Sequence, residues 1–115
     1  MKPKVNLEGY IPLVENMPSG SAYRVDDIIT YRNGVTVEVQ NTDAEGRLIL
    51  ADALIEASEG KPDGIVDLAT LTGSCVVALG DSIAAALSNS DTFRGKVIDA
   101  SEKAGERFWP MPLPS

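Results

Sequence analysis

Histidine is absent from this sequence of 115 residues, and cysteine occurs once, as Cys75. Without histidine, these residues cannot form a Ser-His-Asp or Cys-His catalytic arrangement or a zinc site with a histidine ligand. A single cysteine excludes an intrachain disulfide, which fits a reducing compartment, so we expect a cytoplasmic protein. Any chemistry in this chain therefore depends on carboxylates, lysine, arginine, tyrosine, hydroxyl groups or the backbone.

Positive charge is also scarce, because 10 Lys and Arg residues stand against 17 Asp and Glu residues, giving a net charge of −7. This acidic balance provides no basic surface for phosphate groups, so we expect neither a nucleic-acid nor a membrane partner. No apolar run approaches the roughly 18 residues that span a bilayer, and we expect no signal peptide. The 43% of hydrophobic residues is instead typical of a globular domain.

Hydrophobic patterns alternate between strand-like and helix-like segments, and no repeat or low-complexity tract divides the chain, so we treat residues 1–115 as one unit. Strands are predicted over residues 5–14 with an interruption near Pro12, and over residues 27–31, 35–39, 64–69 and 83–87. Helices are predicted over residues 47–58, 74–79 and 91–107. This alternation indicates an α/β fold with a layered mixed sheet flanked by helices.

Three of these segments have more specific patterns. Arg32-Asn33-Gly34 is a turn sequence between two short strands and predicts a β-hairpin. The helix over 47–58 is expected to be largely buried, with only a narrow polar stripe, and the nearly continuous apolar strand over 64–69 to be buried on both faces. Residues 70–73 then form a loop at the end of that strand.

Asp43 and Glu45 are the residues most suggestive of chemistry. In an extended backbone, residues two apart project to the same side, so both carboxylates can converge on one point. Two close carboxylates repel each other unless a cation or a proton relieves the repulsion, which favours a divalent metal site. Gly46 allows a sharp turn into the helix, and Arg47 adds a positive charge. The simpler alternative is that the two acids cap the helix N-terminus and pair with Arg47.

The run NTDAEGRLILADAL at residues 41–54 resembles the signature of the leucyl (cytosol) aminopeptidase family, dinuclear-metal M17 peptidases. Similar family segments match residues 15–20, 67–73 and 109–113. The sequence departs from the family at Val25-Asp26, where Pro-Gly is usual, and at Ala85-Ala86, where glycine with a larger apolar residue is more common.

The resemblance implies roles for particular residues. Asp43 matches a metal ligand, Glu45 matches the glutamate that bridges two metal ions, and Arg47 matches the arginine that holds a bicarbonate near the reacting water. The residues that match the substrate-binding loop are Thr70, Leu71 and Gly73. The resemblance further implies two divalent metal ions, zinc or manganese, peptide substrates with an N-terminal leucine or other apolar residue, and a homo-oligomer, which is a hexamer in the family. Carboxylate ligands alone suit Mn²⁺ or Mg²⁺, and zinc also accepts them.

The remaining metal ligands of the family, a lysine and two aspartates, and its catalytic lysine lie in a glycine-rich run before the signature. No such run precedes Glu15 here. We therefore expect residues 1–115 to be a fragment of the C-terminal catalytic domain that is inactive when isolated and binds divalent metal weakly. The alternative is a non-catalytic acidic α/β module that acts in assembly, because missing strands would leave sheet edges and apolar faces exposed.

Overall fold

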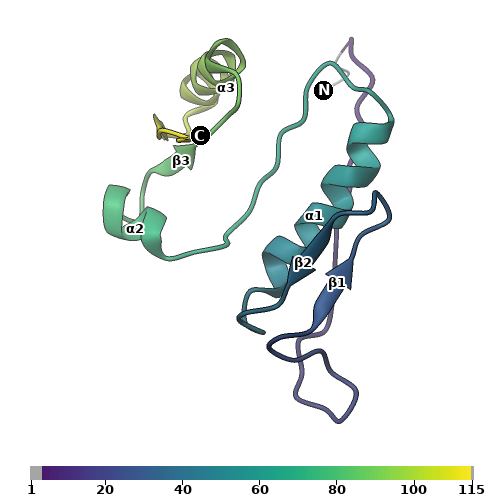
Figure 1. Cartoon of the computed structure of the whole chain (residues 1–115). Coiled ribbons are helices and arrows are strands. Elements are labelled where there is room, and N and C mark those ends of the chain that lie inside the picture. Colours follow the sequence, from purple (N-terminus) through teal and green to yellow (C-terminus); the bar gives the residue numbers. More distant parts are fainter. Residues whose placement is uncertain (1–3, 115) are drawn as a thin grey trace. The chain divides into compact units, whose positions relative to one another are not determined.

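The chain forms two compact units, Met1–Asp67 and Leu68–Ser115, and the computed structural model describes residues 4–114 of them. The first unit contains β1 (Ile28–Thr30), β2 (Thr36–Glu38) and α1 (Glu45–Glu59) (Figure 1). The second contains α2 (Ser74–Leu79), β3 (Ala84–Ala86), α3 (Asp91–Ala104) and β4 (Phe108–Pro110). Helices together with small sheets confirm the α/β class.

Strands β1 and β2 form the predicted antiparallel hairpin, in which Ile29 lies opposite Val37. Gly34 has a φ of 85°, a left-handed conformation that glycine adopts without steric cost, and the Asn33 side chain accepts a hydrogen bond from the backbone N–H of Val35 at 3.1 Å. This hairpin forms because its two strands are joined by a turn of favoured chemistry.

Helix α1 packs against the hairpin, as Figure 1 shows. The Tyr31 hydroxyl donates a hydrogen bond to the Leu48 carbonyl at 2.9 Å, and Arg32 forms ion pairs with Glu56 and Glu59. Tyr31 is 7% exposed and Val39 is 2% exposed, so the core of this unit lies beside the hairpin. The polar stripe of α1 is exposed as predicted, and its apolar residues are mostly shielded from solvent although none is fully buried, so the expectation of a largely buried helix is partly confirmed. The hairpin and one extended segment cover α1 incompletely.

The predicted strand over residues 5–14 is extended but is not a strand. Among residues 4–114 its backbone forms no hydrogen bond to another backbone group. Leu7, Ile11 and Leu13 are more than 80% exposed, although residues 10–14 line a shallow groove with Ile49 of α1. A strand requires a hydrogen-bonding neighbour, and the described residues provide none here.

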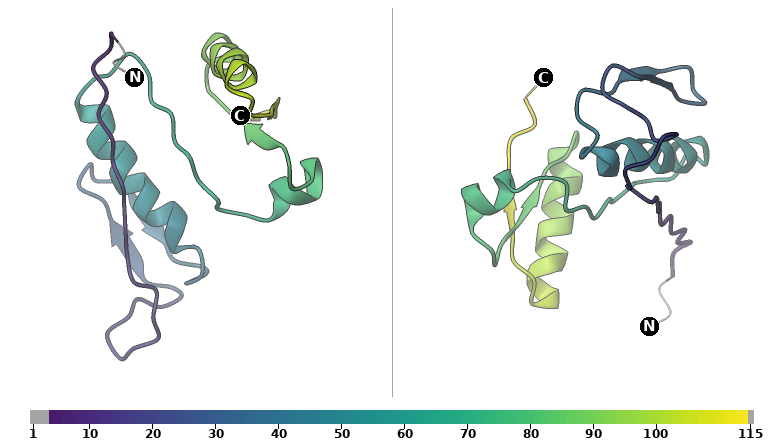
Figure 2. Two further views of the ribbon diagram at one scale, coloured as in Figure 1. Left: turned by 180° about the vertical axis from the view of Figure 1, so that it is seen from behind. Right: turned by 90° about the horizontal axis from the view of Figure 1, so that it is seen from below.

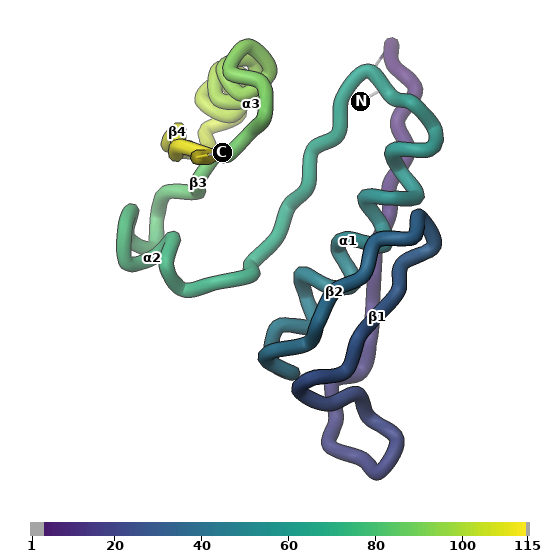
Figure 3. The backbone as a smooth tube through the Cα atoms, in the orientation of Figure 1, coloured from purple at the N-terminus to yellow at the C-terminus, as the bar shows by residue number. Residues whose placement is uncertain are grey.

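The predicted buried strand over residues 64–69 is also wrong. These residues are extended and exposed, and Leu68 is 85% exposed. Figure 3 follows the backbone through this segment, which forms no hydrogen bond to another backbone group within residues 4–114. The apolar sequence favours burial on both faces of a sheet, but the described chain supplies no strand to pair with it.

In the second unit, β3, α3 and β4 form a β-α-β arrangement. Strands β3 and β4 are parallel, with Ala85 opposite Trp109, and α3 packs against β4 (Figure 2). The expected parallel pairing is therefore present, in a two-stranded sheet separate from that of the hairpin, while β4 itself was not predicted from the sequence. Parallel strands need a long connection, and α3 supplies it. Among residues 68–114, Ala86 and Ser101 are the buried ones.

Helix α3 begins and ends at recognisable capping residues. The Ser90 side chain accepts a hydrogen bond from the N–H of Phe93 at 3.3 Å, which satisfies one free donor of the first turn. Gly105 has a φ of 83°, and the N–H of Glu106 donates to the Ser101 carbonyl at 2.9 Å. This left-handed glycine ends the helix at Ala104, so the predicted helix over 91–107 was three residues too long.

Within residues 4–114, no helix is both long and apolar enough to cross a membrane.

Candidate functional site

The segment before α1 forms a turn, so the expected extended backbone at Asp43–Glu45 is wrong. The Asn41 side chain accepts a hydrogen bond from the N–H of Asp43 at 2.9 Å, and the Asn41 carbonyl accepts one from Ala44 at 3.2 Å. Helix α1 follows directly, with Ala44 as its N-cap and Glu45 as its first residue. An asparagine side chain that mimics the backbone favours such a turn over an extended strand.

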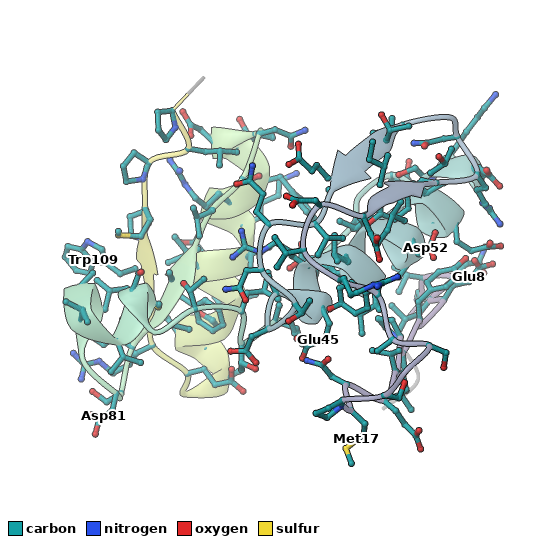
Figure 4. All side chains as sticks on the ribbon, turned by 60° about the horizontal axis from the view of Figure 1, so that its bottom comes forward. Glu8, Met17, Glu45, Asp52, Asp81 and Trp109 are labelled. Atoms are coloured by element: carbon teal, nitrogen blue, oxygen red, sulfur yellow. The ribbon has the colours of Figure 1, made fainter. Side chains whose placement is uncertain are left out.

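The two carboxylates differ in their surroundings. Asp43 is exposed, whereas Glu45 is half-buried and lies where the chain enters α1 (Figure 4). Glu45 Oε2 is buried and has no hydrogen-bond partner among the described residues. Because most buried polar atoms are hydrogen-bonded, an unpaired carboxylate oxygen is unusual.

The capping alternative receives little support. Helix α1 has no hydrogen bond from a side chain at its N-cap, and within residues 4–114 neither Asp43 nor Glu45 forms an ion pair with Arg47. Glu45 does lie in the first turn, where the helix dipole favours negative charge. The oxygens of the two carboxylates are therefore not taken up by nearby amide groups.

Two side chains from an earlier loop contact the same turn. The Tyr23 hydroxyl donates a hydrogen bond to the Thr42 carbonyl at 2.6 Å, and Asn16 Nδ2 donates to that same oxygen at 3.2 Å. Burial raises the pKa of the Tyr23 phenol, and the negative charges of Glu45 and Asp43 raise it further. The phenol thus stays protonated near neutral pH and keeps its donor.

Sequence reasoning did not single out Asn16 or Tyr23. The contacts that they make span 26 and 19 residues of chain, respectively. No periodic pattern or local spacing indicates hydrogen bonds over such a distance. The only available signal was that Asn16 lies in a segment resembling the family, and that signal carried no role.

Arg47 and the predicted substrate-binding residues are accessible. Arg47 is exposed on the first turn of α1 in the first unit. Thr70, Leu71 and Gly73 are exposed in the second unit, where Gly73 is the N-cap of α2 without a side-chain hydrogen bond. Neither threonine of this loop therefore caps the helix. The assigned roles of these residues stay predictions.

Across residues 4–114 there is no group of three or more His, Cys, Asp or Glu side chains arranged to hold a metal ion. Asp43 and Glu45 alone would supply an incomplete coordination sphere, since Ca²⁺, Mn²⁺ and Mg²⁺ take six or more ligands and Zn²⁺ at least four. The donor types nevertheless fit a divalent cation, and the buried unpaired oxygen of Glu45 is the atom that such a cation would satisfy.

Comparison with known proteins identifies the family to which the sequence of this chain is similar. The sequence model of the cytosol aminopeptidase family, catalytic domain, matches residues 1–115. This chain belongs to the cytosol aminopeptidase family. The resemblance of residues 41–54 to that family's signature is thereby confirmed.

Individual members of the cytosol aminopeptidase family agree with this assignment. A probable cytosol aminopeptidase of Persephonella marina is 55% identical over 113 residues, which are 98% of this chain and 23% of the relative. One from Streptomyces avermitilis is 57% identical over 111 residues, or 96% of this chain and 22% of the relative. The solved structure of a mutant tomato leucine aminopeptidase is 51% identical with a TM-score of 0.85, covering 88% of this chain and 20% of its own. The chain therefore spans less than a quarter of the length of these proteins.

Proposed function

We propose that this chain is part of the C-terminal catalytic domain of a cytoplasmic, metal-dependent aminopeptidase. The enzyme would remove N-terminal residues, leucine and other apolar ones, from peptides. Membership of the cytosol aminopeptidase family supports an aminopeptidase. The observation in the structure that supports a metal site is the buried Oε2 of Glu45, which has no hydrogen-bond partner among residues 4–114.

The proposed metal ligands are Asp43 and Glu45. A buried polar group without a partner costs about 1–3 kcal/mol, and more when it is charged, so a cation beside Glu45 Oε2 would relieve an existing cost. A glutamate has two oxygens, which suits the bridging role that the family resemblance implies for Glu45. Oxygen ligands suit manganese and also accept zinc, so two ions of either metal fit these donors. Other ligands of the family lie outside the segment that matches here.

Bound divalent cations polarise a carbonyl group and activate a water molecule for peptide hydrolysis. Asp43 and Glu45 would hold these cations at the start of α1. Arg47, exposed on the first turn of the helix, would supply a fixed positive charge to a bicarbonate or to the negative charge of the transition state. Thr70, Leu71 and Gly73 would bind the peptide backbone of the substrate.

The alternative function is that of a non-catalytic acidic assembly module. Exposed apolar side chains favour this alternative, because Leu7, Leu13 and Leu68 are all more than 80% exposed. The same exposure fits a homo-oligomeric enzyme, a hexamer as in the family, in which other segments cover these side chains. Metal binding separates the two functions, since only the enzyme requires it.

Asp43→Asn and Glu45→Gln in the full-length enzyme that carries these residues test the proposal. Each removes a charged ligand, so we expect the affinity for Mn²⁺ to fall more than about 100-fold, which is the largest loss typical of residues that only support a metal ligand. Isothermal titration calorimetry measures this affinity. Hydrolysis of leucine p-nitroanilide should fall in parallel.

Asp52→Asn is the matched control, because Asp52 is exposed on the same helix and belongs to the polar stripe. It makes the same chemical change away from the proposed ligands and should leave metal affinity unchanged. Equal metal affinity in Asp43→Asn, Glu45→Gln and Asp52→Asn would refute the metal assignment and leave the assembly module as the better function.

A further inference from the structure

The peptide group that joins Thr42 to Asp43 is hydrogen-bonded at all of its polar positions. Its carbonyl oxygen accepts from Tyr23 Oη at 2.6 Å and from Asn16 Nδ2 at 3.2 Å. Its N–H donates to Asn41 Oδ1 at 2.9 Å. A carbonyl oxygen has two lone pairs, so two donors satisfy it fully. This peptide has no hydrogen-bonding capacity left.

Such a peptide group cannot rotate without breaking hydrogen bonds. A peptide unit is planar, so holding both its C=O and its N–H fixes the orientation of the plane. That plane ends at the Cα of Asp43, and the backbone then passes through Ala44 to Glu45. The direction in which the Asp43 side chain leaves the backbone is thereby limited by Tyr23, Asn16 and Asn41.

The hydrogen bonds from Tyr23 and Asn16 are not needed to form the turn itself. Asn41 closes the turn locally, through its own carbonyl and side chain. The attachment of α1 to the hairpin depends instead on Tyr31, whose hydroxyl bonds to the Leu48 carbonyl. Tyr23 and Asn16 thus restrain one peptide that is already in a turn, directly before the two carboxylates.

We propose that Tyr23 and Asn16 are positioning residues, which hold the Thr42–Asp43 peptide so that Asp43 and Glu45 are presented together to a divalent cation. This inference rests on the proposed function, because it takes those two carboxylates as metal ligands. Hydrogen bonds that orient metal ligands reduce the cost of assembling a site. The Tyr23 bond is shorter and less exposed than the Asn16 bond, so it carries the larger effect.

The test uses Tyr23→Phe and Asn16→Ala in the full-length enzyme, with Mn²⁺ as the probe. Loss of a supporting hydrogen bond typically lowers metal affinity about 10–100-fold, and we expect this for Tyr23→Phe, with a smaller loss for Asn16→Ala. Isothermal titration calorimetry measures the affinity. Raising the Mn²⁺ concentration should restore most of kcat, because the ligands themselves are intact.

Tyr31→Phe is the matched control. It deletes the same phenol hydroxyl and also removes one hydrogen bond to a backbone carbonyl, that of Leu48. It should lower the melting temperature while keeping Mn²⁺ affinity within about twofold of the parent. A purely structural role for Tyr23 predicts that Tyr23→Phe behaves like this control, which would overturn the proposal. If Tyr23→Phe does not fold, Asn16→Ala decides by the same comparison.

Asp43→Asn separates a failure of this inference from a failure of the proposed function. If Asp43→Asn loses Mn²⁺ affinity while Tyr23→Phe and Asn16→Ala match Tyr31→Phe, only the positioning role is wrong. If Asp43→Asn keeps its affinity, the metal assignment is wrong and the positioning role falls with it. Reduced affinity in Asp43→Asn, Tyr23→Phe and Asn16→Ala, with normal affinity in Tyr31→Phe, supports both.

Discussion

The hairpin and the extended segment over residues 5–14 belong to the same unit, yet they differ in backbone hydrogen bonding and in the burial of their apolar side chains. Residues of the hairpin are paired through their backbones, and Val39 beside it is 2% exposed. Along residues 5–14 no backbone-to-backbone hydrogen bond forms within the described chain, and Leu13 is 86% exposed. The hairpin therefore supplies its own hydrogen-bonding partners, whereas residues 5–14 resemble a strand that lacks a neighbour.

The difference shows which parts of a fold depend on nearby sequence. A hairpin brings its own partner strand within a few residues, so its hydrogen bonds cost little chain entropy to form. A strand of a parallel or mixed sheet needs partners from distant segments. The matched relatives are more than four times as long as this chain, which leaves ample length for such partners in proteins of that size.

The largest expected effect is a difference in peptidase activity between the isolated chain and the full-length enzyme. We expect the purified chain of 115 residues to show no peptide hydrolysis, because Asp43 and Glu45 are an incomplete ligand set. Leucine p-nitroanilide hydrolysis and Mn²⁺ titration measure this. Peptidase activity in the isolated chain that Asp43→Ala abolishes would contradict the expectation and show that the described residues suffice.

Substitutions in the two contrasting regions should have different costs. Tyr31→Ala removes a buried aromatic ring and should lower the free energy of unfolding by about 3–5 kcal/mol, in the isolated chain and in the full-length enzyme alike. Leu13→Ala should cost under about 0.5 kcal/mol in the isolated chain, where the side chain is exposed. In the full-length enzyme, burial by neighbouring strands should raise that cost to about 2–5 kcal/mol.

Urea denaturation followed by circular dichroism measures both substitutions in both proteins. The comparison depends on Leu13 being unpartnered only in the isolated chain. A Leu13→Ala cost that is equally small in the full-length enzyme would show that residues 5–14 stay exposed there and pair with no other strand.

The smallest expected effect concerns Asp26, which lies just before the first strand of the hairpin. Asp26 has a φ of 73°, a left-handed conformation that disfavours residues with a Cβ, at a position where the family usually has glycine. Asp26→Gly removes this strain, and it should raise the free energy of unfolding by up to about 1 kcal/mol, less the extra chain entropy of glycine. Thermal unfolding measures the change. A lower melting temperature would mean that the aspartate side chain contributes more than its backbone strain costs.

Local sequence chemistry accounts for the elements that were predicted well. The Asn33-Gly34 turn predicted the hairpin, and the predicted helix over 74–79 matches α2 in both its bounds. Helix α1 begins two residues earlier than expected, because the turn at Asn41 leads directly into it. Strand β4 was missed because a three-residue strand that contains Pro110 has no strand-like pattern of its own.

The candidate site was only partly predictable. The acidic pair and Arg47 were found because they lie in a contiguous run that resembles a family signature. The extended geometry assumed for that run was wrong, since the Asn41 side chain closes a turn there. Tyr23 and Asn16 were missed because each acts through a single backbone oxygen far along the chain.

The sequence by itself determined the features that depend on neighbouring residues: the hairpin turn, the bounds of α2, the acidic balance and the family signature. Only the tertiary structure decided which distant groups meet, such as Tyr23 with the Thr42 carbonyl, Tyr31 with Leu48, and β3 with β4. The physical reason is that local structure follows from backbone preferences and short-range hydrogen bonds. Distant contacts depend on how the whole chain packs, and no single segment encodes them.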